Sequence, residues 1–352
     1  MVKHRTRGGH ARRHGLFASA LLLGLGCGGG KGATADAGTG GAPVGGSGAG
    51  QDSGGDSGAG GTGGATVLAL GEAEPSTIVV DDTYVYWTTT TAVRRMPKEG
   101  GAVTTLFSSL DSPDELKADD TSLYWTSIHA NQGVMSGAKT GGTITTVAPG
   151  TARGLTIDAD FAYWIQDGPS DEVMVRLAKM GGGTPATIAS QTSFGRAAAD
   201  DQFLYWAEGH MGRIQRVAKA GGTIVDLRAK DPDTTILATL DAIDIYFVTY
   251  GPVAQSSTLQ RIAKTGGATT MLASGLDQPS DLAVTADAVY WLAQGDSGPT
   301  GALIKLSKTN GSQLSKVASQ APYRLALDAQ YVYWTELGDH GFKNGRIVRI
   351  AR

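Results

Sequence analysis

The stretch DDTYVYWTTT, residues 81–90, recurs in seven related copies along most of the chain. Each copy has a tyrosine followed directly by a second aromatic ring, which is tryptophan in six copies and phenylalanine in one. Successive second rings lie between 38 and 44 residues apart, so one structural unit of constant size is repeated. The pairs are Tyr86–Trp87, Tyr124–Trp125, Tyr163–Trp164, Tyr205–Trp206, Tyr246–Phe247, Tyr290–Trp291 and Tyr333–Trp334.

Each repeat divides into four short apolar segments separated by turns, and none has helical periodicity. An alternating segment such as 155–158 is followed by an Asp-rich turn, the segment with the aromatic pair, a loop of variable length and two more segments. The last two are joined by a Lys-x-Gly-Gly turn, in which glycine supplies the positive φ angles of a tight hairpin. The pattern predicts an all-β chain that folds as a seven-bladed β-propeller of four-stranded blades.

Adjacent residues of a strand point to opposite sheet faces, so each aromatic pair sends one ring toward each neighbouring blade. The rings are therefore predicted to be core residues and not a ligand platform. The repeated acids are interpreted as turn residues and the repeated lysines as a solvated rim. The acids are Asp81, Asp119, Asp158, Asp200 and Asp328, and the lysines are Lys98, Lys139, Lys179, Lys219, Lys264 and Lys308.

The seventh repeat stops after its third strand, at residues 345–352, and lacks a fourth. Residues 67–78 align without gaps to residues 271–282, which run from a fourth strand into the next repeat, so that Pro75 matches Pro279. Residues 65–70 are thus a fourth strand that precedes the first blade. We expect it to complete the last blade, because this closes the ring and leaves no open sheet edge.

The repeat resembles that of the YWTD propellers of lipoprotein-receptor ectodomains. The matching residues are 85–88, 123–126 and 332–335, followed by an Ile-x-Arg-x-x-Lys-x-Gly-Gly pattern, and the resemblance covers about residues 65–352. Thr89, Ser127 and Glu336 stand where that family has the aspartate, and the repeat count is seven where the family has six. The resemblance implies the blade geometry and a domain that binds other macromolecules.

The first 27 residues have the features of a bacterial lipoprotein signal peptide. Five basic residues precede a short apolar run, 16–26, and the chain's only cysteine, Cys27, follows it as the predicted lipidation site. Ordinary cleavage that leaves a free thiol is the alternative. Residues 28–65 are Gly-rich and lack aromatic rings, so they are predicted to be a disordered tether ahead of the propeller domain, 66–352.

Charge and hydropathy exclude several kinds of partner. Residues 1–26 carry five positive charges and no acid, so their removal changes the formal net charge from −3 to −8. Such an acidic chain is not expected to bind nucleic acid, and no later segment has the length of a membrane span. We expect a monomer in the bacterial cell envelope, attached through its lipid alone and facing the periplasm or the exterior.

The start of the innermost strand of each blade places charged residues around one mouth of the predicted central channel. Three arginines and two acids there suit an anionic or sugar-like ligand, although ion pairs among them are the alternative. The candidates for ligand binding are Glu115, Arg153, Arg196, Asp281 and Arg324. The seven aligned positions are Thr77, Glu115, Gly154, Arg196, Ile236, Asp281 and Arg324, with Arg153 beside one of them.

No catalytic or metal motif is recognisable, so no catalytic residue or metal ligand is assigned. His129, His210 and His340 fall in three different loops, with Glu208 or Asp339 as further metal ligands, but without metal-ligand spacing. Gly-Asp pairs at 295–296 and 338–339 and Glu74 are weak candidates for calcium.

Three functions are therefore open. The first is a lipid-tethered module that binds an extracytoplasmic protein or polysaccharide without a cofactor. The second is a calcium-dependent propeller enzyme, lactonase-like or lyase-like, with its site at the channel mouth. The third is a structural subunit of an envelope complex.

Overall fold

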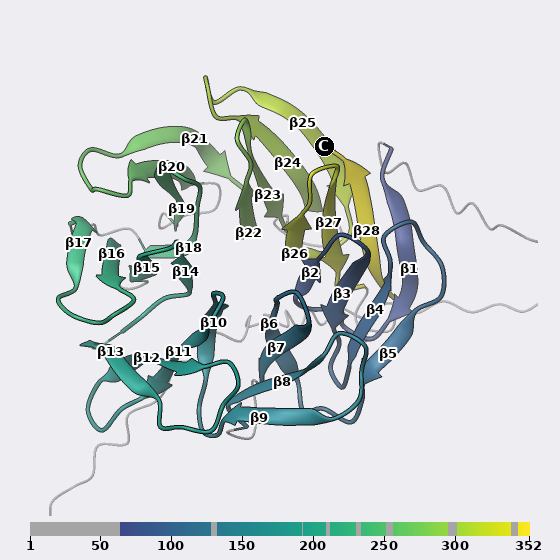
Figure 1. Ribbon diagram of the computed structural model, residues 1–352. Helices are drawn as coiled ribbons and strands as arrows, with labels where there is room; N and C mark the ends of the chain where they lie inside the picture. Colours follow the sequence, from purple (N-terminus) through teal and green to yellow (C-terminus); the bar gives the residue numbers. More distant parts are fainter. Residues whose placement is uncertain are drawn as a thin grey trace, which may run out of the picture. The chain divides into compact units, whose positions relative to one another are not determined.

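A computed structural model describes residues 64–127, 132–191, 193–208, 212–229, 234–250, 256–294, 301–338 and 344–352. The described residues form seven four-stranded antiparallel sheets arranged in a ring, so the predicted seven-bladed β-propeller is confirmed (Figure 1). Cys27, the signal peptide and almost all of the tether lie outside the described residues. The described part of the chain contains no helix that is long and apolar enough to cross a membrane.

Blades 1 to 6 each consist of four consecutive strands. Blade 1 contains β2 (Ile78–Val80), β3 (Tyr84–Thr88), β4 (Val93–Pro97) and β5 (Thr104–Phe107). Blade 2 contains β6 (Pro113–Ala118), β7 (Ser122–Ser127), β8 (Val134–Ala138) and β9 (Ile144–Ala148), and blade 3 contains β10 (Arg153–Ile157), β11 (Phe161–Asp167), β12 (Glu172–Ala178) and β13 (Ala186–Gln191). Blade 4 contains β14 (Ala197–Ala199), β15 (Phe203–Glu208), β16 (Arg213–Ala218) and β17 (Val225–Arg228). Blade 5 contains β18 (Thr234–Leu240), β19 (Asp244–Tyr250), β20 (Ser257–Ala263) and β21 (Thr270–Leu276), and blade 6 contains β22 (Pro279–Val284), β23 (Ala288–Ala293), β24 (Gly301–Ser307) and β25 (Gln313–Ser319).

Blade 7 joins the two ends of the propeller. It contains β26 (Pro322–Leu327), β27 (Tyr331–Glu336) and β28 (Gly345–Ala351), and its outer strand is β1 (Thr66–Glu72) from the start of the described chain. β1 pairs antiparallel with β28, with Thr66 opposite Arg349 and Glu72 opposite Gly345, and the two strands lie side by side in Figure 1. The predicted closure of the last blade by an N-terminal strand is therefore confirmed.

The core consists of seven clusters, one in each wedge between neighbouring blades. Each cluster contains the tyrosine of one blade and the second ring of the next, for example Tyr86 with Trp125 and Tyr333 with Trp87. Trp87, Trp206, Phe247 and Trp334 are fully buried. The interpretation of the aromatic pair as core is confirmed: its two rings fill the two wedges beside its own blade.

The repeated acids occupy the turns between the first and second strands of their blades, as predicted. In blade 1, Asp81 Oδ1 accepts the backbone N–H groups of Thr83 and Tyr84 at 2.9 and 2.8 Å, and Oδ2 accepts the Tyr86 hydroxyl at 2.9 Å. The same geometry adds one turn to the predicted set, that of Asp241.

The repeated lysines are not a solvated rim, and that interpretation is wrong. Each lysine reaches back to the turn aspartate of the preceding blade, as Lys139 does to Asp81 at 2.9 Å, and the six lysine side chains are only 8–15% exposed. The reason is that the Lys-x-Gly-Gly turn of one blade lies beside the Asp-rich turn of its neighbour. We call each set of aspartate, tyrosine and lysine a clasp. The six clasps are Asp81–Tyr86–Lys139, Asp119–Tyr124–Lys179, Asp158–Tyr163–Lys219, Asp200–Tyr205–Lys264, Asp241–Tyr246–Lys308 and Asp328–Tyr333–Lys98.

Candidate functional site

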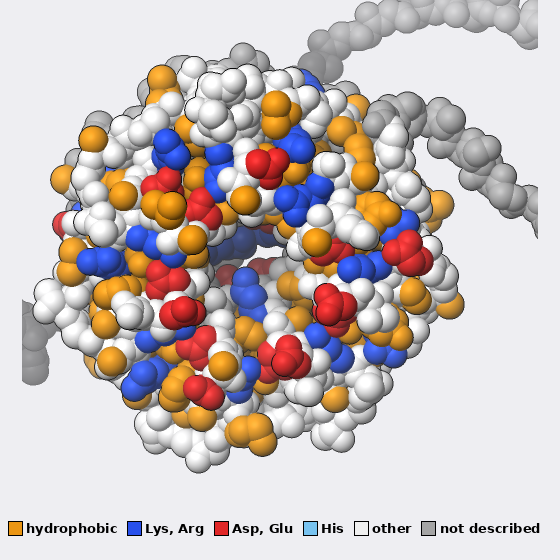
Figure 2. Space-filling view, turned by 45° about the horizontal axis from the view of Figure 1, so that its top comes forward, with side chains coloured by type: hydrophobic (Ala, Val, Ile, Leu, Met, Phe, Trp, Pro, Cys, Tyr) orange, Lys and Arg blue, Asp and Glu red, His pale blue; other side chains and the backbone are white. Residues whose placement is uncertain are grey.

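The innermost strands of the seven blades surround a central channel that contains a cavity of about 400 Å³. Charged side chains of both signs gather around the central opening, with Lys or Arg side chains inside it (Figure 2). Four of the charged residues that line the cavity stand at or near the starts of their strands, at the end of the channel next to the variable loops, and Lys117 stands further along β6. Those that line the cavity are Glu115, Lys117, Arg196, Asp281 and Arg324.

Four of the five predicted ligand-binding residues thus line one cavity. Arg153 is not among the residues that line it; its guanidinium forms an ion pair with Glu172 instead. The aligned position in blade 5 also differs from the prediction. In blades 1, 4, 6 and 7 the aligned residue directly precedes the residue that pairs with the second aromatic ring. In blade 5 the residue that pairs with Phe247 is Ala238, because the register of β18 and β19 shifts between Thr235 and Leu237. The aligned position is therefore Leu237 and not Ile236.

The two acids of the channel mouth connect neighbouring blades. Glu115 Oε2 accepts the backbone N–H of Leu155 at 2.9 Å, and Asp281 Oδ2 accepts that of Leu325 at 2.9 Å. Asp281 Oδ1 also accepts the N–H of Leu282 at 3.0 Å. These carboxylates therefore satisfy backbone donors of the channel wall, and only part of their hydrogen-bonding capacity remains for a ligand.

The two arginines of the mouth differ in how firmly they are held. Arg324 donates to the carbonyl oxygens of Ser280 and Tyr323, both at 3.1 Å, and stacks over the Tyr323 ring at 4.0 Å. Arg196 has one long contact, 4.0 Å from Nε to Glu115 Oε1, and no hydrogen bond to any other described residue. Its side chain is 43% exposed and lines the cavity, so donors of this guanidinium remain without a partner among the described residues.

Lys117 is a further charged residue of the channel that the alignment of strand starts did not identify. It follows Glu115 by two residues in β6, so alternation along the strand places it on the same, inward face. Within the described residues its amine has no ion pair and no hydrogen bond. Burial lowers the pKa of Lys117, and Arg196 acts in the same direction, while Glu115, Asp281 and Asp114 act against them.

Asp114 adds a negative charge beside the mouth. Burial acts to raise the pKa of this carboxyl, but Arg196 and the Thr77 hydroxyl, which donates to Oδ1 at 2.8 Å, outweigh burial and lower it. Asp114 is therefore ionised near neutral pH. The channel mouth therefore holds charges of both signs close together. Its cationic side chains have hydrogen-bond donors without partners among the described residues, whereas its carboxylates already accept most of their hydrogen bonds from the protein.

The described residues contain no group of three or more His, Cys, Asp or Glu side chains placed to hold a metal ion. His129, His210, His340, Asp296 and Asp339 lie outside the described residues. Glu208 forms an ion pair with Arg213 at 2.5 Å, and Glu72, close to the weak calcium candidate Glu74, accepts Trp87 Nε1 at 2.8 Å and pairs with Arg94. Glu72 and Glu208 are thus engaged in ion pairs of the blade edges.

Comparison with known proteins supports the fold and does not extend to a family. The sequence matches no protein-family model and has no significant match among curated proteins. A catalytically inactive virginiamycin B lyase from Staphylococcus aureus, bound to quinupristin, is similar in structure with a TM-score of 0.59 and 14% identity, over 81% of this chain and 98% of that one. An oligogalacturonate lyase in complex with manganese has a TM-score of 0.59 and 12% identity, over 83% and 94%. The AfRom2 CNH domain has a TM-score of 0.57 and 8% identity, over 81% and 98%, and at these identities the likenesses show the β-propeller fold alone.

Proposed function

We propose that this protein is a β-propeller binding module, attached to the bacterial cell envelope through a lipid on Cys27, that takes a carboxylate-bearing polysaccharide at its channel mouth. The structure itself shows the β-propeller fold. The lipid attachment rests on the basic segment, the apolar run and the single cysteine of residues 1–27. A monomer fits the closed ring, since all seven sheets of the described residues are complete.

One observation carries the choice of ligand. Arg196 and Lys117 line the channel cavity with donors that have no hydrogen-bond partner among the described residues. Glu115 and Asp281, in contrast, already accept hydrogen bonds from backbone N–H groups. The unsatisfied groups of the cavity are therefore cationic donors. Guanidinium and ammonium groups bind carboxylates by charge-assisted hydrogen bonds, and the remaining acceptor capacity of the acids suits sugar hydroxyls.

Titration calorimetry with trigalacturonate, and with a neutral trisaccharide as the comparison ligand, tests the proposal. We expect trigalacturonate to bind and Arg196→Met to weaken binding about tenfold, as for the loss of one charge-assisted hydrogen bond. Arg153→Met is the matched control, because this arginine has the same 43% exposure but does not line the cavity. Equal losses in both variants would contradict the channel site.

The same samples test the enzyme alternative. A lyase acting on trigalacturonate would produce an unsaturated product that absorbs in the ultraviolet, and calcium would be required if the calcium-dependent alternative were correct. We expect intact ligand and no dependence on added calcium. Accumulation of the absorbing product would show that the protein is an enzyme and would contradict the binding-module proposal.

Membrane attachment has a separate test. Cys27→Ala is expected to leave an unprocessed precursor and to remove lipid labelling, which mass spectrometry of the membrane fraction detects. Unchanged processing and fractionation would refute the lipid anchor and leave the channel proposal intact.

A further inference from the structure

A long groove separates blades 5 and 6 on their outer side. Its volume is about 920 Å³, within the range of pockets that hold small organic molecules. One wall is β21 of blade 5 and the other is the sheet of blade 6, from Gly311 near the clasp side to Asp277 near the variable loops. The lining combines apolar side chains, from Leu272, Leu276, Trp291, Ile304 and Leu306, with polar groups that include Asp277, Gln313 and Lys316.

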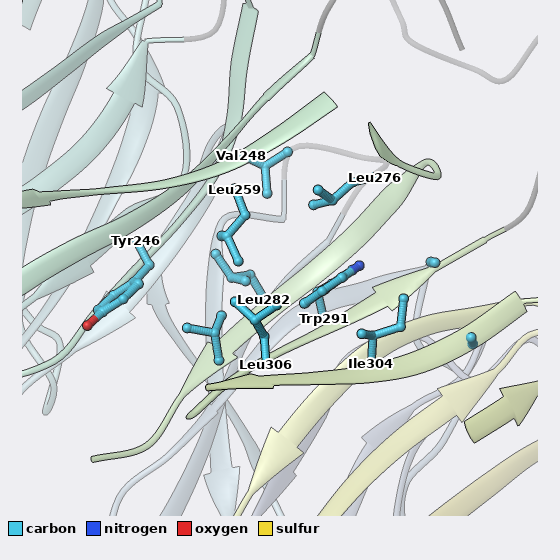
Figure 3. Close-up of a cluster of buried hydrophobic side chains, with 11 residues drawn as sticks. Tyr246, Val248, Leu259, Leu276, Leu282, Trp291, Ile304 and Leu306 are labelled. Carbon is cyan, nitrogen blue, oxygen red and sulfur yellow. The ribbon is translucent and has the colours of Figure 1, made fainter. Parts of the chain in front are cut away.

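Trp291 brings an unpaired hydrogen-bond donor to this groove. The residue is 4% exposed, and its buried Nε1 has no partner among the described residues, whereas the Nε1 groups of Trp87, Trp206 and Trp334 each donate a hydrogen bond. Figure 3 shows the ring among Leu276, Leu282 and Ile304, with its nitrogen-bearing edge directed away from Leu282. An unpaired buried N–H group destabilises the folded protein, so a ligand group that accepts its hydrogen gains affinity.

Three other wedges show what is missing here. Trp87 Nε1 donates to Glu72 at 2.8 Å, and Trp334 Nε1 donates to Ser319 at 2.8 Å. Both acceptors end the outer strand of the preceding blade, and the corresponding residue at the end of β21 is Leu276.

A second kind of acceptor is also replaced. Trp206 Nε1 donates to Gln215, which stands opposite it on the next strand, at 3.0 Å. The residue opposite Trp291 is Ile304. Two apolar residues thus occupy the positions that supply acceptors to Trp87, Trp334 and Trp206, and both line the groove in which the Trp291 donor remains unpaired.

We propose that this groove binds an acyl chain whose carbonyl or carboxylate oxygen accepts the Trp291 Nε1 hydrogen. The apolar walls contact the chain along the wedge, and the Leu276 side chain turns aside to admit the oxygen to the indole. Among the described residues of the lining, Lys316 is the one cation and Asp277 the one acid, and Lys316 favours the carboxylate form. The site lies between two blades at the outside of the ring and shares no residue with the channel cavity.

Displacement of the fluorescent probe 1-anilinonaphthalene-8-sulfonate from the full chain tests the site. Decanoate below its micelle concentration represents a free fatty acid, and monomeric dihexanoyl phosphatidylcholine represents an ester-linked chain. We expect saturable displacement by decanoate, and displacement by the phospholipid alone would assign the site to esterified chains. Displacement by neither would overturn the proposal.

Two variants locate the binding. Trp291→Phe removes the donor and is expected to weaken decanoate binding about fivefold to tenfold. Leu276→Ser restores the acceptor found at Ser319 and is expected to weaken binding at least as much, because the indole is then satisfied internally. Trp334→Phe, whose indole is paired in the wild type, should leave decanoate binding unchanged. Circular dichroism establishes that each variant is folded, and wild-type affinity in both Trp291→Phe and Leu276→Ser would overturn the assignment.

Discussion

Six of the seven wedges of the propeller have a clasp, and the wedge between blades 6 and 7 does not. Where the other repeats have the turn aspartate, blade 6 has Thr285, and the Tyr290 hydroxyl is consequently buried without a partner. The position of the lysine is taken by Arg352, which lies 3.8 Å from Asp287 and donates to the carbonyl oxygens of Asp328 and Ala329 at 2.8 and 3.4 Å. The comparison separates two contributions to the ring: aromatic packing is present in all seven wedges, and the ionic clasp is an addition to it.

Removal of an aromatic ring should therefore have the largest effect in any wedge. Trp87→Ala deletes a fully buried ring, and we expect the free energy of unfolding to fall by about 3–5 kcal/mol. Trp334→Ala, in the wedge without a clasp, should cost a similar amount. Urea denaturation followed by circular dichroism measures both, and a loss below about 1 kcal/mol in either variant would contradict core packing as the common contribution.

Removal of one clasp should have a smaller but clear effect. Asp81→Ala leaves Lys139, whose side chain is 12% exposed, without its carboxylate and removes the acceptor of the Tyr86 hydroxyl. We expect a loss of about 2–3 kcal/mol in the same assay, because a partly buried charge and a phenol lose charge-assisted bonds. Asp82→Ala is the matched control, since this neighbouring acid is exposed. Equal effects of the two substitutions would show that the clasp adds nothing to the turn.

The clasps also predict how stability depends on pH. Burial acts to raise the pKa of Asp81, but Lys139, the N–H groups of Tyr84 and Thr83 and the Tyr86 hydroxyl lower it from 3.8 to about 2. The pKa values of Asp119, Asp200 and Asp328 are likewise lowered to about 2. A carboxyl whose pKa is lower in the folded state stabilises fully above its unfolded pKa, and this stabilisation is lost as the pH falls toward about 2.

Chemical denaturation at a series of pH values between 7 and 2 measures this loss. The free energy of unfolding should decrease on acidification, and it should decrease less in Asp81→Asn than in the wild type. Parallel curves for the two proteins would contradict the assigned pKa shift.

The smallest expected effect is the gain from building the missing clasp. Thr285→Asp supplies an acceptor for the Tyr290 hydroxyl and a partner for Arg352, while the N–H of Ala288, which now donates to the Thr285 hydroxyl at 3.1 Å, keeps an acceptor. We expect stability to rise by about 1 kcal/mol, with steeper loss at low pH. A destabilised variant would show that the wedge between blades 6 and 7 is organised differently.

The fold could be predicted because repetition multiplies a weak signal. A single Tyr-Trp pair says little about its environment, but seven at blade spacing identify the second strand of each blade, and the alignment of residues 67–78 with 271–282 places β1. The clasps could not be predicted in the same way. Lys139 and Asp81 belong to different repeats, and nothing local distinguishes a lysine on a solvated turn from one that reaches the neighbouring blade.

The channel mouth was predictable only in part. Glu115, Arg196, Asp281 and Arg324 share one position in the repeat, and the alignment therefore brought them together. Lys117 stands one step further along the same face of β6, at a level where the other blades carry uncharged residues such as Thr156 and Ala198, so no repeated pattern marks it. Whether the Trp291 indole finds a hydrogen-bond acceptor depends on residues of other strands. The Tyr-Trp pair is the same in six repeats and therefore gives no sign of this difference.

The pairing of β1 with β28 also determines how the chain could be reconnected. Because Thr66 and Arg349 are partners in one ladder, the two ends of the propeller lie next to each other, and a short linker could join them. Reopening the joined chain at the Lys-x-Gly-Gly turn of another blade, such as residues 264–267, would give a circular permutant with the same ring. In that permutant blade 7 would be built from consecutive strands, and the blade that contains the cut would become the one completed by both ends of the chain.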